Sequence, residues 1–139
     1  MLRRALFQIG WHLHRLLYRL TGGRAGGSGT LELRTVGRRS GDQRMTLLSY
    51  LGDGENLVVV GSNAGSERPP AWSLNLEAAP DAEVVLGGRA MPVHAHWASG
   101  PERDRLWSRL QAGNPAFERY QEMAGREVPV IVLEPRARA

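Results

Sequence analysis

The sequence predicts an α+β domain in which helices flank an antiparallel, barrel-like sheet. About six short segments have the alternating or continuous apolar pattern of strands, and turns rich in Gly, Pro and Asp separate them. Helical segments are few by comparison, which favours an antiparallel sheet. A length of 139 residues suits one domain of ordinary size.

Residues 2–20 are predicted to form an amphipathic helix that precedes the domain. Its apolar residues follow one helical stripe: Leu2, Leu6, Ile9, Leu13, Leu16, Leu17 and Leu20. Arginines occupy other faces, and their charges exclude a transmembrane span. The stripe would pack on the domain or on a second copy of the chain; alternatively, the basic helix would lie on an anionic membrane surface. Residues 21–29 have the composition of a flexible linker, so we assign 1–29 to helix and linker and 30–139 to the domain.

From residue 30 onward, strands are expected to alternate with tight turns. Leu31 and Leu33 alternate with charged residues, which is the pattern of a half-buried strand. Residues 57–60 are continuously apolar, which is typical of a buried strand. Strands are predicted at 30–36, 43–51, 57–60, 82–87, 89–97 and 128–133, with turns at 37–42, 52–54 and 87–88.

Helices are predicted at three places in the domain. Residues 71–78 follow Pro70 and end before Pro80, which cannot continue a helix. The second helix covers 101–112 with Pro101 in its first turn, and the third covers 115–124. Residues 61–70 are predicted to be a loop.

All 18 basic residues are arginines, and lysine and cysteine are absent. These absences exclude disulfides, thiolate metal sites, cysteine nucleophiles, Schiff-base lysines and the P-loop lysine. Residues 1–44 carry nine arginines against two acids, whereas residues 45–139 carry nine against twelve. A basic front on an acidic body indicates an anionic partner for the front: a phosphate ligand, a membrane surface or nucleic acid.

Three segments could hold an anionic or planar ligand. Residues 37–41 have the sequence GRRSG and are followed by Arg44, so backbone amides, a hydroxyl and arginine forks could grip a phosphate. Residues 61–65, GSNAG, could form a concave nest for an anion or a flat ring. Trp72 and Asn75 share one helix face and could border a ring. Taken singly, each pattern also fits a structural role: a solvated turn, a plain loop, and a core tryptophan with a capping amide.

The histidines do not predict a metal site. His94 and His96 alternate in a strand and face the same side, but zinc would need a third ligand, so a solvated strand face is expected. We find neither a Ser-His-Asp arrangement nor a paired-carboxylate motif. Phe117 and Tyr120 lie three residues apart on a helix and could overhang a pocket or fill the core.

Taken in order, these segments resemble one family. The resemblance covers residues 5–135 and rests on 35–41 (TVGRRSG), Arg44, 57–65 (LVVVGSNAG), 70–76 (PAWSLNL) and 128–135 (VPVIVLEP). Together they resemble the deazaflavin-dependent nitroreductases, which are the F420H2-dependent quinone reductases of actinobacteria. The resemblance implies a split β-barrel of the FMN-binding type and coenzyme F420 rather than FMN. It also implies a place in the cytoplasm, with the inner face of the plasma membrane as the site of any lipid contact.

The family's cofactor joins a deazaflavin ring to a phosphodiester and a polyglutamate tail. By resemblance, the basic turn holds the phosphate, and the start of the next strand, the following loop and the helix after it line the ring. The implied cofactor-binding residues are Arg38, Arg39, Ser40, Arg44, Thr46, Leu47, Ser62, Asn63, Ala64, Gly65, Ala71, Trp72 and Asn75. Ser73, Phe117 and Tyr120 are the implied substrate residues. Tyr120, Ser62 or solvent would deliver the proton.

The implied reaction is hydride transfer from the reduced deazaflavin to an electron-poor acceptor, namely a quinone, an enone or a nitroaromatic. Many relatives carry tyrosine where Ser73 stands. Some carry three tyrosines where this chain has Asn114, Phe117 and Tyr120, so the sequence does not name the acceptor. Two alternatives stay open: a biosynthetic ene-reductase or cyclase that reuses the barrel, and a non-enzymatic binder of phosphate or nucleic acid. The scarcity of aromatic residues and the acidic second half argue against nucleic acid.

Overall fold

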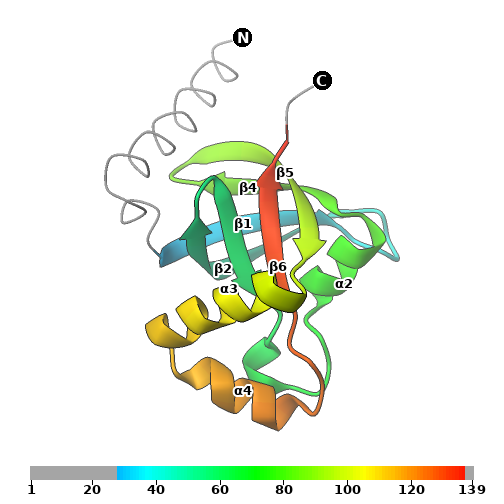
Figure 1. The fold of residues 1–139 in the computed structure, drawn as a ribbon. Helices are drawn as coiled ribbons and strands as arrows, with labels where there is room; N and C mark the ends of the chain where they lie inside the picture. Colours follow the sequence, from blue (N-terminus) through cyan, green and yellow to red (C-terminus); the bar gives the residue numbers. More distant parts are fainter. Residues whose placement is uncertain (1–27, 137–139) are drawn as a thin grey trace.

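The computed structural model describes residues 28–136, which form a closed barrel of six antiparallel strands (Figure 1). The strands are β1 (Ser28–Val36), β2 (Gln43–Asp53), β3 (Asn56–Val60), β4 (Asp81–Leu86), β5 (Arg89–Trp97) and β6 (Val130–Pro135). Their order is β1-β2-β3-β6-β5-β4, and β1 pairs with β4 to close the barrel. The predicted α+β class with an antiparallel barrel is confirmed. The helix expected at 2–20 and most of the linker at 21–29 lie outside the described residues.

All six predicted strands are present, and β6 is displaced most from its expected position. It begins at Val130 rather than at residue 128, and its pairing with β3 starts at Val60↔Val130. Pro129 has no N–H to offer to a ladder, and its carbonyl accepts a hydrogen bond from the Gly61 N–H at 3.0 Å. β1 begins at Ser28, so the sheet includes the last two residues of the predicted linker.

The barrel interior is filled by apolar side chains that point inward from alternate strand positions, and Leu76 of helix α2 (Ala71–Ala78) joins them. The buried members of this cluster are Leu31, Leu33, Leu57, Val59, Leu76, Ala82, Val84, Met91, Val93, Ala95, Ile131 and Leu133. Val58 belongs instead to a second cluster outside the barrel, together with Leu106 and Leu110. The continuous apolar run at 57–60 is therefore buried on both faces, as the sequence predicts.

The helices are α2 (Ala71–Ala78), α3 (Gly100–Gly113) and α4 (Ala116–Ala124), each within one residue of its predicted bounds. α3 covers the outer face of β3 and β6, because Leu106 and Leu110 pack on Val58, Val130 and Val132. In Figure 1, α4 lies at the lower end of the molecule, beside the loop between β3 and α2. Within residues 28–136, no helix has the length and apolarity needed to cross a membrane.

An ion cluster ties α3 to the hairpin of β2 and β3. The Asp53 carboxylate accepts two hydrogen bonds from Arg105, at 2.9 and 3.0 Å, and one from Arg109 at 3.0 Å. Arg109 also donates to the carbonyl of Gly52 at 3.1 Å. The hydrogen bond from Arg105 holds the pKa of Asp53 below its usual range. The Asp53 side chain is only 17% exposed, so water screens this cluster less than an ordinary surface pair.

The loop between β3 and α2 contains a short 3₁₀ turn, η1 (Asn63–Gly65), where the sequence predicted only loop. Its three residues have φ values of 45°, 53° and 83°, a region that costs a residue with a side chain about 1–2 kcal/mol. Arg126 holds this segment in place. Its guanidinium donates to the carbonyls of Gly61 at 3.0 Å and Ser66 at 3.3 Å. The strained turn therefore depends on an arginine that is distant in sequence.

Substituting Gly65 should destabilise the fold more than substituting another glycine of positive φ. A Cβ at Gly65 would lie 3.2 Å from Met123 Cβ and 3.3 Å from Tyr120 Cα, whereas a Cβ at Gly54 would meet nothing within 4 Å. We expect Gly54→Ala to lower the free energy of unfolding by about 1–2 kcal/mol. Gly65→Ala should lower the free energy of unfolding by about 1–3 kcal/mol more than this, because the added Cβ overpacks against α4. Urea denaturation of both variants measures the difference, and equal losses would contradict the tight packing of η1 on α4.

Candidate functional site

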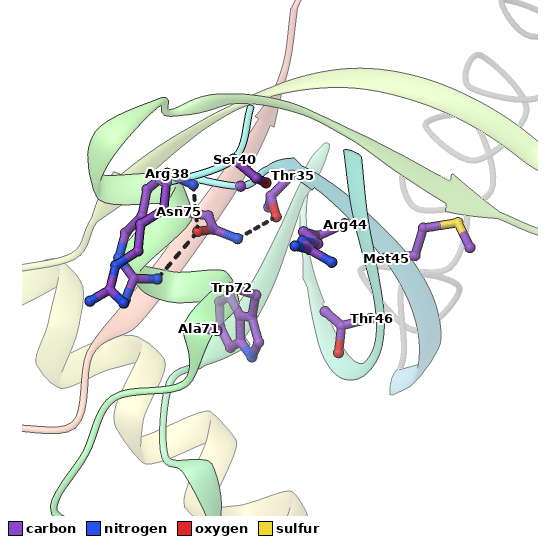
Figure 2. A pocket seen from close by; sticks show the side chains of 11 residues that line it. Thr35, Arg38, Ser40, Arg44, Met45, Thr46, Ala71, Trp72 and Asn75 are labelled. Carbon is purple, nitrogen blue, oxygen red and sulfur yellow. Dashed lines mark hydrogen bonds between the residues drawn. The ribbon is translucent and has the colours of Figure 1, made fainter. Parts of the chain in front are cut away.

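The first cavity lies between the turn at 37–42, the start of β2 and the first half of α2 (Figure 2). It has a volume of about 600 Å³. Its lining residues are Thr35, Gly37, Arg38, Arg39, Ser40, Arg44, Met45, Thr46, Ala71, Trp72 and Asn75. Eight of the predicted cofactor-binding residues are therefore brought together, although they come from three separate segments: Arg38, Arg39, Ser40, Arg44, Thr46, Ala71, Trp72 and Asn75.

The turn at 37–42 is closed by its own backbone and by Ser40. The Gly37 N–H donates to the Asp42 carbonyl at 2.7 Å, and the Gly41 N–H donates to the Gly37 carbonyl at 2.8 Å. The Ser40 hydroxyl accepts from the Asp42 N–H at 3.1 Å. A Cβ at Gly37 would lie only 2.7 Å from this hydroxyl oxygen, so a larger residue there would displace Ser40. The two flanking glycines thus set the shape of the turn that carries the arginines.

Asn75 connects this turn to α2 and to β1. Its Oδ1 accepts from the Arg38 backbone N–H at 3.1 Å and from the Arg38 guanidinium at 3.5 Å. Its Nδ2 donates to the Thr35 hydroxyl at 3.1 Å. Both Asn75 and Thr35 are buried, so each needs these hydrogen bonds. Figure 2 shows Asn75 between Arg38 and Thr35, and we assign it a positioning role for the turn.

The arginines of the first cavity differ from most other arginines of the domain in their partners. Arg105 and Arg109 bind Asp53, and Arg34 binds Glu32 and Glu83. By contrast, Arg38, Arg39 and Arg44 make no ion pair with any residue from 28 to 136. Three exposed guanidinium groups without an acid favour an anion at this cavity.

The remaining wall of the first cavity is partly apolar. Trp72 is half-buried and packs on the barrel core, and Met45 and Thr46 come from the start of β2. Leu47, a predicted ring contact, does not line this cavity, and 72% of its surface is exposed on the outer side of β2. Thr35 also lines the cavity, although it was not predicted to bind a ligand. The inward alternation of Leu31 and Leu33 could have placed Thr35 on the same face.

The predicted residues of the loop at 61–70, and the predicted residue Ser73, do not line the first cavity. Ser62 and Gly65 are buried, and the side-chain amide of Asn63 donates to the Arg68 carbonyl at 3.0 Å. Ala64 is exposed on η1. Ser73 is buried, and its hydroxyl donates to the Pro70 carbonyl at 2.9 Å. In this structure these residues shape the loop and the start of α2.

The second cavity lies between α3 and the outer faces of β1, β2 and β3, with a volume of about 330 Å³. Its wall is largely apolar, and its lining residues are Gly29, Thr30, Ser49, Tyr50, Leu51, Val58, Val60, Arg109, Leu110, Gly113, Asn114 and Phe117. Phe117 was predicted as a substrate residue, whereas Arg109 was not singled out. Tyr120 is not a lining residue, but its ring meets Phe117 edge-on with centroids 6.2 Å apart. Burial raises the pKa of Tyr50.

The two strand histidines are engaged by carboxylates. His94 Nδ1 lies 2.7 Å from Asp81, and this hydrogen bond lowers the pKa of Asp81. His96 contacts Glu102 at 2.9 Å and Glu134 at 2.7 Å. No group of His, Asp and Glu suited to a metal ion occurs among the described residues.

Known proteins share both the sequence and the fold of this chain. The sequence profile of the family described as F420H(2)-dependent quinone reductase matches residues 11–135. The F420H(2)-dependent quinone reductase Rv1261c of Mycobacterium tuberculosis is 36% identical over 135 residues, covering 89% of each chain. A solved F420-H2-dependent reductase, FDR-A, superposes with a TM-score of 0.68 at 27% identity, covering 76% of this chain and 93% of its own. A structure described as a domain-swapped dimer has a TM-score of 0.69 at 27% identity, covering 76% of this chain and 79% of its own.

Removing the Asn75 side chain should loosen the basic turn. Asn75→Ala deprives the Arg38 N–H and the Thr35 hydroxyl of their partners, so we expect the free energy of unfolding to fall by about 1–3 kcal/mol. Thr35→Val is the matched control, because it removes the bond to Asn75 Nδ2 but leaves the one to Arg38. Amide hydrogen exchange at Arg38 should accelerate in Asn75→Ala alone. Equal exchange in both variants would show that Asn75 does not hold the turn.

Proposed function

Because the chain belongs to the F420H(2)-dependent quinone reductase family, it is an oxidoreductase that uses coenzyme F420, and we propose that the first cavity holds the anionic part of this cofactor. The observation that carries the proposal is the group of Arg38, Arg39 and Arg44, which have no acidic partner within the described residues. A guanidinium can bind a phosphate through two parallel hydrogen bonds. The cavity therefore has donors of the chemistry that a phosphodiester needs.

Other lining residues of the first cavity suit the planar part of the cofactor. Trp72 and Thr46 line the cavity with Met45, and Asn75 anchors the turn to α2. When bound, reduced F420 supplies a hydride from C5 of its deazaflavin. The chain itself needs only to bind the cofactor, orient it and exclude water from the reacting face.

We place the quinone in the second cavity. Its wall is mostly apolar, which suits a flat, uncharged acceptor. β2 connects the two sites, because Met45 lines the first cavity and Ser49 lines the second. Side chains four positions apart in a strand point to the same face, and the distance along the strand is about 13 Å. The proposed acceptor site thus lies along the same face of β2 as Met45 at the proposed cofactor site.

The predicted proton donors, Tyr120 and Ser62, have different positions. Ser62 is buried directly before η1. Tyr120 packs against Phe117, which lines the second cavity, and its hydroxyl has no hydrogen-bond partner among residues 28–136. Tyr120 is therefore the better placed of the two, with solvent as the other source of the proton.

The cofactor assignment is tested by titrating the purified chain with F420 and with FMN and following cofactor fluorescence. We expect binding of F420 in preference to FMN. Replacing Arg38, Arg39 and Arg44 together with Gln should weaken F420 binding by at least about 100-fold, because several charge-assisted hydrogen bonds are lost. Arg119→Gln removes an exposed positive charge of α4 and should leave the affinity near that of the wild type. Failure of the wild type to bind F420, or equal affinity in the triple variant, would refute the assignment.

The basic amphipathic segment at 2–20 supports a second proposal, contact with anionic membranes. Quinones that dissolve in lipid would then be reached from the membrane surface. We expect the full chain to float with vesicles that contain anionic lipid and not with neutral vesicles. Deleting residues 1–24 should abolish flotation without changing F420 affinity. A full chain that does not float but elutes as a dimer, which the deletion makes monomeric, would favour packing of the leucine stripe against a second copy.

A further inference from the structure

We propose that Arg109 binds the acceptor in the second cavity, where its guanidinium donates to an acceptor oxygen and stabilises the negative charge that reduction places on it. This inference rests on the proposed role of the second cavity as the quinone site. Arg109 adds a residue of α3 to an acceptor site that the sequence analysis sought in Ser73, Phe117 and Tyr120.

Arg109 is the one charged residue among the described residues that line this cavity. The other lining residues are apolar or carry small neutral polar groups, as in Leu51, Val58, Leu110, Phe117 and Ser49. A hydrogen bond to a charged donor is stronger in such surroundings than in water, because the effective dielectric constant is lower. A guanidinium in this wall would therefore discriminate strongly between a neutral and an anionic oxygen.

The ion cluster holds Arg109 in place and engages only two of its N–H donors. The Arg109 side chain is 39% exposed and contributes one N–H to Asp53 and one to the Gly52 carbonyl. A guanidinium has five N–H donors, and the others have no partner in the described part of the chain. Asp53 is also bound through both oxygens by Arg105. One carboxylate therefore faces two guanidinium groups.

The chemistry of quinone reduction calls for such a donor. The hydride brings two electrons and a proton to the quinone, one C=O bond becomes C–O–H, and the other oxygen takes up the negative charge. One proton from water then completes the hydroquinone, and one proton passes to water from the cofactor as it is oxidised. Arg109 remains protonated throughout, since guanidinium does not release its proton in proteins. Its contribution is electrostatic stabilisation of the hydroquinone monoanion.

The test compares Arg109→Gln with Arg105→Gln. Both variants remove a guanidinium from Asp53, but only Arg109 lines the second cavity. The probe is 4-nitrophenol, whose ionised form is yellow and resembles a hydroquinone monoanion. The full chain, with and without F420, is titrated with the probe across the pH range in which the probe ionises. Urea denaturation confirms that each variant is folded.

We expect the wild type and Arg105→Gln to bind the phenolate in preference to the phenol. Arg109→Gln should lose about tenfold or more of this preference, the value of one charge-assisted hydrogen bond. Arg109→Lys should recover part of it, because the charge is kept and the planar fork is lost. The same order should hold for kcat/KM in quinone-dependent F420H2 oxidation, with unchanged F420 affinity.

The two proposals fail in different ways. A wild type that binds F420 but does not oxidise F420H2 when any quinone is supplied would overturn the assignment of the second cavity as the acceptor site. An active wild type whose Arg109→Gln and Arg105→Gln variants bind the phenolate equally would overturn the role of Arg109 alone.

Discussion

The insertion of β6 between β3 and β5 is the constraint on which the rest of the structure depends. It joins β3 to β5, so that, with β1 paired to β4, apolar side chains of all the strands meet in one interior. It also makes β3 and β6 a continuous outer surface on which α3 packs through Leu106 and Leu110. With α3 fixed there, Arg109 and Leu110 form one wall of the second cavity while β2 forms another. The two cavities are consequences of barrel closure, because no local segment contains either.

Some arginines of the described chain stabilise the fold, whereas others are available to bind an anion. The sequence alone does not distinguish the two groups. Arg126 fills a structural need, because it donates to carbonyls of the strained loop around η1. Arg39 has no acidic partner in the described chain and lines the first cavity. A guanidinium suits both tasks, since its planar fork can bind several oxygens at fixed angles. A bound anion is expected where guanidinium groups converge and the protein supplies no oxygen to match them.

The sequence predicted those features that have a local cause. Alternating or continuous apolar residues located all six strands, and prolines located the starts of α2 and α3. The basic turn was predicted as an anion site because its glycines and arginines lie within a few residues of one another. η1 could not be predicted, since Asn63 and Ala64 carry side chains that disfavour positive φ and are held there by tertiary contacts. Arg109 was not predicted for the same reason, because its surroundings come from distant segments. Ser73 stays a prediction as a substrate residue, since its surroundings also depend on tertiary contacts.

The outer side of β2 shows how the two proposed sites could act together. Met45 and Leu47 alternate on this side, with 62% and 72% of their surfaces exposed. Single exposed apolar residues are ordinary on protein surfaces. These two, however, lie on the strand between Arg44, at the first cavity, and Ser49, at the second. A cofactor ring that extended from the first cavity past Met45 would contact this apolar strip on its way towards the proposed acceptor site. The exposure of Leu47 is therefore compatible with the ring contact that its sequence position implies, although Leu47 lines neither cavity.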